Sequence, residues 1–511
     1  MTIRRFALPI PVLVLLAVFL YRAPSRTASG TIDVDYYWHL GYGEWILDHG
    51  HLPTVDFWSW TFAGHTYNLT QWLGEVLMAV AHRAGGGELG TQLLSAALVT
   101  LTIAFGYLAA RAFLENRLAA LTVAFACDAI LISLACRPHQ FTHLGLAILT
   151  AVLAHYHVRG DRRLLYAVPP VMAVWANLHG GYAVGLAYLW MSVGFLAADA
   201  YMTHRHEDFK RTILPLAIAA LAGTVATLAN PYGLGAWQYA IDIASMKSSS
   251  AGIVDEWGPT NIKMDVGLNW FIASTAVFGA MATSSRRPSL SALLSAVTLI
   301  AVGWSALRLS LMMSVLLVPL LAANLRHTAL YTLAFDGAAR QYDRSVRPMM
   351  SLIILALVLG VAIVMAKGDK TSSQYITANL PEQEVAFMKA NHISGRIMNN
   401  PEIGGYLIRN LGQKVFLDTR LDLYGDRVLF DFLFARRGEA GWREFVTRHD
   451  PDVLVLDNIS SLRQLLTDTG MYRIVFEGPR YSVLVRPNTY LPLPSISASS
   501  GRRSLLDLLK P

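Results

Sequence analysis

The sequence contains few charged residues and almost no cysteine. Only 15% of its 511 residues are Asp, Glu, Lys or Arg, whereas a soluble chain usually carries about 25%. Such a deficit is typical of a surface that faces lipid, because an ionised side chain costs several kcal/mol at bilayer depth. The two cysteines, Cys127 and Cys136, share one apolar run and match no metal-ligand spacing. The composition therefore argues against a disulfide scaffold, a cysteine metal centre and a soluble globular chain.

Long apolar runs occupy most of the first 370 residues. A helix that crosses a membrane needs about 20 predominantly apolar residues. By this criterion we expect about eleven spanning helices, at residues 6–21, 89–110, 118–135, 141–157, 164–178, 182–201, 213–229, 266–283, 290–304, 309–325 and 349–365. The first run follows Arg4 and Arg5 but precedes no clear cleavage site, so we interpret it as an uncleaved anchor rather than a signal peptide.

The basic residues indicate which loops lie on which side of the membrane. With the N-terminus inside, the inner loops hold more than twice as many Lys and Arg residues as the outer loops. A span at residues 71–82 would move the basic clusters at 159–163 and 205–211 outside, against the positive-inside rule. We therefore interpret 71–82 as a helix in the interface, and read the net charge of +7 as topology rather than nucleic-acid affinity. The predicted location is the bacterial inner (cytoplasmic) membrane, with a cytoplasmic N-terminus and a periplasmic C-terminal domain.

The C-terminal region has the composition of a soluble domain. Runs 415–418, 453–457, 472–476 and 482–486 predict strands, and 382–390, 442–448 and 461–467 predict helices. We expect a transmembrane module at 1–370, a periplasmic α/β domain at 371–490 and a disordered tail at 491–511. The predicted fold class is a membrane all-α helical bundle with interfacial helices in its first outer loop and a small C-terminal α/β extracytoplasmic domain.

Polar residues gather at the outer ends of the predicted helices, although they come from six distant segments. This set comprises Asp33, Asp35, His39, Asp56, Gln71, Arg137, His139, Asn177, His179, Glu256 and Arg308. Taken singly, the acids can be solvated loop residues, the arginines can reach lipid head groups, and the histidines can serve packing. Those readings do not explain why the acids and the Arg-Pro-His and Asn-x-His clusters all face outward.

The chemistry that such a set supports is glycosyl transfer from a lipid-linked sugar. Negative charge develops on the phosphate that leaves the sugar, and arginine forks match that charge. The acceptor hydroxyl must lose a proton to a carboxylate within hydrogen-bond reach. Preorganised cations would stabilise the leaving group. Amphipathic helices at 35–48 and 71–82 could lie on the membrane and admit a long isoprenoid tail.

The stretch 33–56, DVDYYWHLGYGEWILDHGHLPTVD, resembles the GT-C superfamily of integral-membrane glycosyltransferases. Protein mannosyltransferases and the aminoarabinose transferases of lipid A belong to that superfamily. The segment Trp72-Leu-Gly-Glu75, the Arg137-Pro138 step and the C-terminal stretches at 400–408 and 416–425 look more like uncharacterised bacterial members. The resemblance covers nearly the whole chain.

The resemblance implies two interfacial helices, a catalytic Asp in the first outer loop and a polyprenyl-phosphate-linked sugar donor. By position the base is Asp35 or Asp33, and Asp35 is favoured because it directly precedes the Tyr-Tyr-Trp-His run. The other residues of the set are expected to bind substrate. Gln71 stands where relatives often carry an acid, so we assign no cofactor and leave a divalent metal open.

The sequence thus predicts transfer of a sugar from a polyprenyl-phosphate donor to a lipid, glycan or protein acceptor on the outer face. The expected partners are that donor, the acceptor and membrane lipid, without nucleic acid.

A flippase for a lipid-linked saccharide is a second hypothesis, but the acids within spans, Asp128 and Asp199, lie away from the midplane. A third is a non-catalytic subunit of polysaccharide assembly. Asp418, Arg420 and Asp422 could equally close a structural turn or touch ligand.

Overall fold

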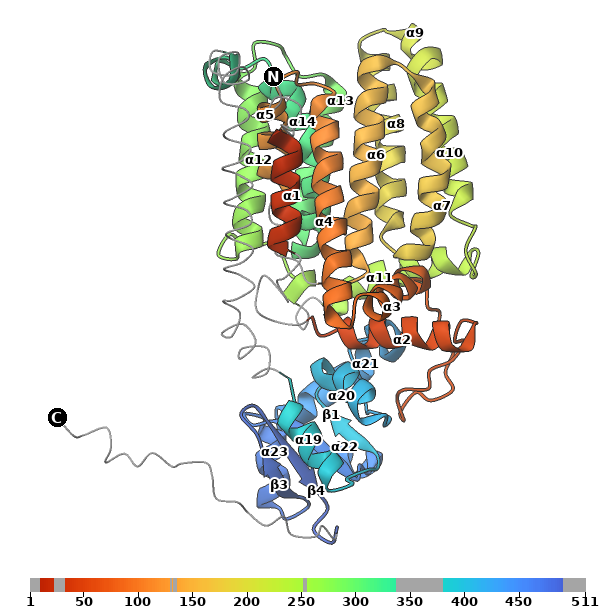
Figure 1. The fold of residues 1–511 in the computed structure, drawn as a ribbon, viewed down its shortest axis with the longest axis vertical. Helices are drawn as coiled ribbons and strands as arrows, with labels where there is room; N and C mark the ends of the chain where they lie inside the picture. The colour runs from red at the N-terminus through yellow and green to blue at the C-terminus, as the bar shows by residue number, and fades with distance from the viewer. Residues whose placement is uncertain are drawn as a thin grey trace, which may run out of the picture.

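The computed structural model describes residues 10–22, 33–128, 131, 136–250, 255–336 and 380–489. These residues form a helical bundle, two helices that lie across one end of it, and a part with a β-sheet beyond them (Figure 1). The predicted span at 349–365 and the tail at 491–511 lie outside the described residues.

Ten helices of more than ten residues run along the bundle in the described ranges. They are α1 (Ile10–Arg22), α4 (Glu88–Arg111), α5 (Arg117–Asp128), α6 (His139–Arg159), α7 (Val168–Leu178), α8 (Tyr182–Met202), α10 (Leu214–Ala226), α12 (Asp265–Thr283), α13 (Leu290–Ser305) and α14 (Leu307–Leu325). Shorter elements connect them: η3 (Arg162–Ala167), α9 (His206–Asp208), η4 (Phe209–Ile213), η5 (Asp255–Trp257), α15 (Ala329–Tyr331) and η6 (Thr332–Asp336), with α11 (Gly235–Ser250) at the end nearer the sheet.

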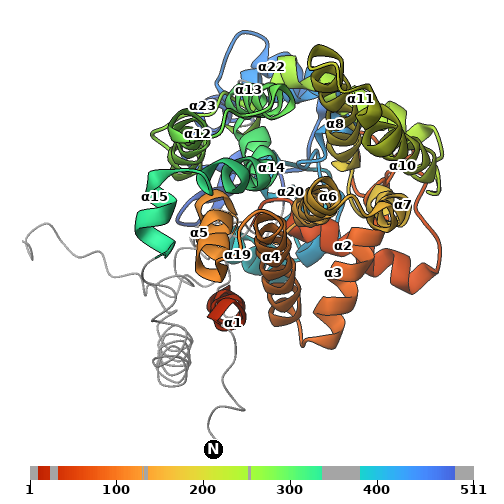
Figure 2. The ribbon, with the colours of Figure 1, turned by 90° about the horizontal axis from the view of Figure 1, so that it is seen from above.

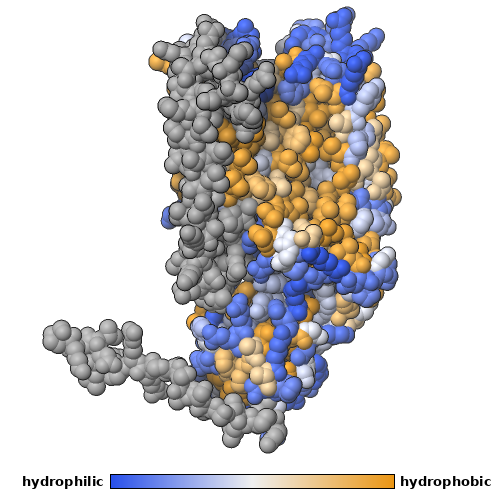
Figure 3. Space-filling view, viewed as in Figure 1, coloured by the Kyte–Doolittle hydropathy of each residue, from blue (hydrophilic) through white to orange (hydrophobic). Residues whose placement is uncertain are grey.

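Six helical segments in the described part are long and apolar enough to cross a membrane. They are Glu88–Arg111, His139–Arg159, Tyr182–Met202, Phe209–Ala226, Asp265–Thr283 and Leu307–Leu325, and Pro11–Tyr21 and Leu290–Ser305 are shorter apolar helices. The visible side of the bundle is mainly hydrophobic between hydrophilic ends (Figure 3). α6 and α14 lie near the middle of the bundle (Figure 2) and are the most buried of the six. The break expected at 305–308 is present, because Ala306 is extended between α13 and α14.

Small residues allow the helices to approach closely. Trp175 of α7 is 2% exposed and packs against Gly145 of α6 and Gly185 of α8. A Cβ atom at either glycine would lie 2.5 Å from the indole. Close packing at small residues is what stabilises helix pairs in lipid, where burial of apolar surface gives no driving force.

The helices α2 (Tyr36–His49) and α3 (Trp72–Ala84) lie across the bundle end and pack on each other (Figure 1). A Cβ atom at Gly43 would lie 2.0 Å from the carbonyl oxygen of Glu75, so this crossing requires glycine. Both helices were predicted from the sequence as interfacial rather than spanning, and both lie crosswise.

The C-terminal part contains a four-stranded sheet of order β1-β2-β4-β3, parallel between β1 and β2 and otherwise antiparallel. Its elements are α19 (Glu382–Ala390), β1 (Ile397–Asn399), α20 (Pro401–Leu411), α21 (Leu421–Arg436), α22 (Trp442–His449), β2 (Val453–Asp457), α23 (Ser461–Asp468), β3 (Arg473–Glu477) and β4 (Tyr481–Val485). Three of the four predicted strands are present within a residue or two. The strand at 415–418 is wrong, because Val415 makes only isolated bridges there.

The C-terminal part packs directly against α2 and the loop that follows it. Arg409 of α20 forms an ion pair with Glu44 of α2. Trp60 lies against Phe416 with ring centroids 5.3 Å apart. These contacts place residues 418–422 beside the first turn of α2, and this brings a C-terminal loop to the candidate site.

Candidate active site

Arg137 connects the two acids of the first loop to each other. It immediately precedes α6, and its Nη1 lies 3.0 Å from Asp33 Oδ2 while its Nη2 lies 2.8 Å from Asp35 Oδ2. The backbone N–H of Asp35 also donates to Asp33 Oδ1 at 2.9 Å. Burial raises the pKa of Asp33 to about 6, although the charge of Arg137 opposes the shift. Two carboxylates and one guanidinium thus form a compact, partly buried cluster.

Glu256 and Arg308 extend this cluster. Glu256 Oε1 accepts from Arg137 Nη1 at 3.1 Å, and its Oε2 lies 4.0 Å from Arg308 Nη1. The guanidinium carbon of Arg308 lies 5.2 Å from the ring centroid of Trp257, a cation–π geometry. Arg308 therefore has a loose carboxylate contact and remains able to bind a further anion.

The C-terminal part holds Asp35 from the other side. The Thr419 hydroxyl donates to Asp35 Oδ1, and Trp38 Nε1 donates to the same oxygen at 3.3 Å and to Thr419 Oγ1 at 3.0 Å. Both oxygens of Asp35 are thus fixed by named donors. Because a catalytic group must be held close to its productive position, this arrangement suits a residue that performs chemistry.

His39 and Glu75 form a buried pair one layer away, between α2 and α3. His39 Nδ1 lies 2.9 Å from Glu75 Oε1. Burial lowers the pKa of His39 well below its ordinary value, and the nearby Arg137 and Arg308 lower it further. Burial raises the pKa of Glu75 well above its ordinary value. Both shifts favour the neutral form of the side chain, and the 2.9 Å contact has the length of a hydrogen bond.

Glu75→Gln is expected to preserve this contact, because glutamine has the shape of a protonated glutamate. The pKa of Glu75 is higher in the native protein than in the unfolded chain. At a pH between these two pKa values, native Glu75 is protonated more than unfolded Glu75, so its contribution to stability falls as the pH rises. The glutamine of the variant does not titrate. The melting temperature of Glu75→Gln relative to wild type should therefore rise as the pH is raised above the ordinary pKa of a glutamate. A difference in melting temperature that falls as the pH is raised would show that native Glu75 is ionised. Glu75→Ala should be destabilised by about 1–3 kcal/mol, because His39 loses its partner.

Two further predicted residues, His179 and His139, lie near Arg137 and Arg308. His179 follows α7, and its Nδ1 accepts from the backbone N–H of Gly181 at 3.0 Å and lies 2.8 Å from Thr142 Oγ1. Its Nε2 therefore carries the proton in the neutral ring. His179 lies within electrostatic range of Arg308, His39 and Arg137. His139, the first residue of α6, is in range of Arg137 and Arg308. Neutral imidazoles beside two guanidinium groups suit a phosphate.

Asn177 and Gln71 lie where α3 meets α7. Asn177 Oδ1 accepts from Trp72 Nε1 at 2.9 Å, and its amide donates to the Ala229 carbonyl at 2.8 Å. Asn177 thus ties α3 to two bundle helices. Gln71 is the N-cap residue of α3, and its side chain does not cap that helix.

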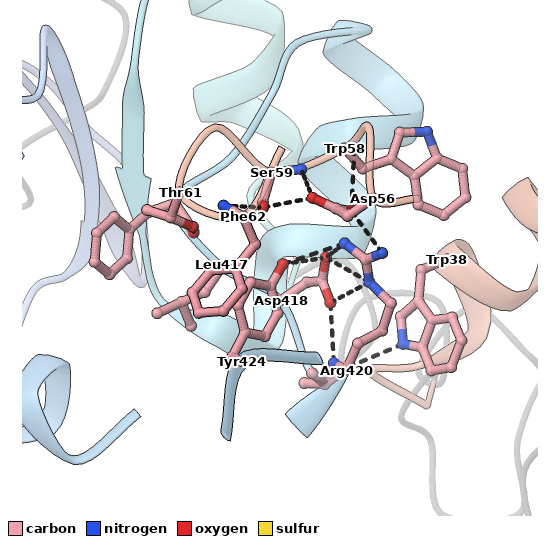
Figure 4. A network of polar contacts seen from close by, with 12 residues as sticks. Trp38, Asp56, Trp58, Ser59, Thr61, Phe62, Leu417, Asp418, Arg420 and Tyr424 are labelled. Carbon is pink, nitrogen blue, oxygen red and sulfur yellow. Dashed lines mark hydrogen bonds and ion pairs between the residues drawn. The ribbon is translucent and has the colours of Figure 1, made fainter. Parts of the chain in front are cut away.

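Asp56 belongs to a separate buried network (Figure 4). Its Oδ1 pairs with Arg420 Nη1 at 2.8 Å, and its Oδ2 accepts from the Ser59 hydroxyl at 2.6 Å. Arg420 also pairs with Asp418 at 2.7 Å, and the side chains of all three ionic residues are fully buried. The structure therefore places Asp56 with Arg420 and Asp418 and does not bring it to Arg137.

For Asp422 the sequence left open a structural turn or a ligand contact, and it did not single out Tyr239 at all. These two residues come from α21 and α11, share a side-chain hydrogen bond, and Tyr239 lies in range of Arg308. Burial raises the pKa of Asp422 to about 6, against the opposing charge of Arg420. Thr419 was missed as well. The only sequence signal was the polar run 418–422, whose neighbours in space cannot be read from its spacing.

A divalent metal would need carboxylates that are free to coordinate it. No group of three or more His, Cys, Asp or Glu side chains in metal-binding geometry occurs among the described residues. Asp33 and Asp35 are both engaged by Arg137, which occupies the position that a shared cation would need. The residues in this arrangement do not fit a metal, and each step proposed for the site involves only the chain's own side chains.

The arrangement of a crosswise helix pair on a helical bundle, with a C-terminal part packed against that pair, was compared with known proteins. No family model and no curated protein matches the sequence. The fold is nevertheless clear from solved structures, and the GT-C fold predicted from residues 33–56 is confirmed.

Two proteins illustrate this likeness. ArnT from Cupriavidus metallidurans, bound to undecaprenyl phosphate, has a TM-score of 0.51 at 14% identity over 93% of this chain and 97% of that chain. The archaeal oligosaccharyltransferase AglB from Archaeoglobus fulgidus, in complex with an inhibitory peptide and a dolichol-phosphate, has a TM-score of 0.56 at 11% identity. That match covers 87% of this chain and 69% of AglB. At such low identity the likeness shows the fold alone.

Proposed function

We propose that the chain is a glycosyltransferase that moves a sugar from a polyprenyl-phosphate-linked donor to a lipid, glycan or protein acceptor on the outer face of the membrane. The observation that carries this proposal is the convergence of Asp33, Asp35, Arg137, Glu256 and Arg308 from four distant segments at the crosswise end of the bundle. The GT-C fold supports the proposal, as do the polyprenyl phosphates bound to ArnT and AglB.

In the proposed reaction the acceptor hydroxyl attacks the anomeric carbon of the donor sugar. The carbon–oxygen bond to the phosphate breaks, the new glycosidic bond forms, and the hydroxyl proton passes to a carboxylate. Asp35 is our first choice for that base, because Thr419, Trp38 and Arg137 fix its position. Asp33 is the alternative, since a group of pKa about 6 is ionised at neutral pH yet still basic enough to take a proton.

The leaving phosphate gains negative charge as its bond to the sugar breaks. Arg308 is the guanidinium with the weakest carboxylate contact in the pocket, at 4.0 Å from Glu256, and can turn its fork to phosphate oxygens. Arg137, held by three carboxylates, is better suited to position the acids. The His179 Nε2–H adds a neutral donor. Prearranged donors of this kind stabilise developing charge without reorganisation.

The test compares a deletion strain complemented with wild type or with the Asp33→Asn/Asp35→Asn variant. Mass spectrometry of envelope glycans and lipids should show that the variant lacks one glycosylated product and accumulates a lipid-linked sugar. That sugar should be oxidised by periodate added outside, because the proposed reaction takes place on the outer face. Accumulation that is protected from periodate would instead favour a flippase. Full product formation by the double variant would favour a non-catalytic subunit.

A further inference from the structure

A cavity lies at the end of the bundle away from the candidate active site. It has a volume of about 310 Å³ and is lined by the last turns of α6 and α14, the middle of α8 and the first turns of α13. Its lining combines apolar side chains, such as Leu153, Phe195 and Leu320, with five serines, two histidines and Asn324. This size and mixture are typical of a pocket for a ligand with an apolar body.

The mouth of this cavity is positively charged. Arg286 and Arg287, in the loop before α13, line it and are exposed. Neither arginine forms an ion pair with an acid in the ranges that the structure describes. Arg205, by contrast, forms an ion pair with Asp199 at 2.6 Å. The other carboxylate oxygen of Asp199 accepts a hydrogen bond from the backbone N–H of Leu290 at 3.1 Å, at the start of α13. Both oxygens of Asp199 therefore already have partners.

We propose that this cavity binds an anionic phospholipid of the leaflet opposite the candidate active site. The phosphodiester would lie on the Arg286–Arg287 pair at the mouth, and an acyl chain would fill the apolar interior. Charge complementarity selects an anionic over a zwitterionic lipid, since arginine forks match phosphate oxygens and basic pockets between spanning helices attract anionic head groups. The apolar walls favour a lipid over free phosphate, which would leave the interior of the cavity empty. The proposal does not depend on the transferase activity.

The experiment uses the full chain in vesicles of equal parts phosphatidylglycerol and phosphatidylcholine. After extraction into mild detergent, native mass spectrometry counts the lipids retained by each protein. Wild type should retain phosphatidylglycerol preferentially, and Arg286→Gln/Arg287→Gln should weaken retention by about thirtyfold, the factor expected for two arginine–phosphate contacts. The matched control is Arg162→Gln/Arg163→Gln, which removes the same charge from an exposed pair at the same end of the bundle and should retain lipid as wild type does.

Two further arms separate the cavity from surface charge and from free phosphate. Ala292→Phe fills the cavity without changing charge and should also reduce phosphatidylglycerol retention, whereas added inorganic phosphate should not displace the lipid. Equal losses in both arginine double variants, unchanged retention in Ala292→Phe, or displacement by phosphate would each overturn the proposal. Melting temperatures of all variants establish that each protein is folded before its lipids are counted.

Discussion

Asp35→Asn is expected to reduce sugar transfer by about 10²- to 10⁴-fold, the usual contribution of a general base. The asparagine oxygen can still accept from Thr419 and Trp38, so the substitution removes basicity and charge but keeps the shape of the contact. Melting temperature and the amount of protein in the membrane should change little. The readout is the rate at which membranes convert the accumulated lipid-linked sugar to product.

Asp33→Asn separates the two candidate bases. If Asp35 is the base, Asp33→Asn should lose less activity than Asp35→Asn, because Asp33 then acts by holding Arg137. A larger loss in Asp33→Asn would assign the base to Asp33. Asp48→Asn is the control, since Asp48 is exposed in the last turn of α2 and its ion pair in the described ranges is with Arg83 at the surface. Wild-type activity in both Asp33→Asn and Asp35→Asn would show that neither carboxylate takes part in the reaction.

The polar residues that converge in the structure could be grouped from the sequence because membrane helices obey strong local rules. Apolar length located the helices, and basic loops showed that α3 lies crosswise rather than spanning. Arg137 and Asp33 are 104 residues apart, yet both follow from the rule that polar groups lie at helix ends. The predicted number of eleven spans is not confirmed, since α5 and α7 are short where described and residues 349–365 lie outside the described ranges.

The contribution of the C-terminal part could not be predicted in the same way. Thr419 and Asp35 are 384 residues apart, and no periodicity in either segment encodes their contact. The composition of the run 418–422 could not decide whether its residues close a structural turn or touch ligand. In the structure Asp418 and Arg420 belong to a buried ionic network, whereas Asp422 forms a hydrogen bond with Tyr239 near the candidate active site. Apolar residues 415–417 suggested a strand, but they are buried by packing with the first loop instead.

Arg420→Met is expected to have the second large effect, on stability and indirectly on activity. The Arg420 guanidinium lies between Asp56 and Asp418 (Figure 4). It also donates to the hydroxyls of Tyr42 and Tyr424. Removing it leaves two carboxylates buried without a cation, which costs about 3–5 kcal/mol. The melting temperature should fall markedly. Lysine should not substitute well, because it lacks the planar fork that contacts both acids.

A second variant distinguishes uncompensated charge from lost packing. Asp56→Asn/Asp418→Asn/Arg420→Met removes all three charges, and replacing a complete buried ionic cluster is often neutral or stabilising. This triple variant should therefore be more stable than Arg420→Met alone. Arg437→Met, at an exposed arginine near Glu439, is the control and should melt as wild type does. If Arg420→Met also melts as wild type, the network contributes nothing to stability.

The same substitution tests how the C-terminal part reaches the chemistry. Thr419 directly precedes Arg420 and donates to Asp35, so loosening the loop releases one oxygen of the proposed base. Arg420→Met should therefore lower the transfer rate even at temperatures where the protein remains folded. Thr419→Val removes the hydroxyl without disturbing the ionic network and should reproduce that loss of rate with a near-normal melting temperature. A different result is an active Thr419→Val variant and an inactive Arg420→Met variant. In that case the ionic network would act on the candidate active site through α2, because Arg420 also donates to Tyr42 on that helix.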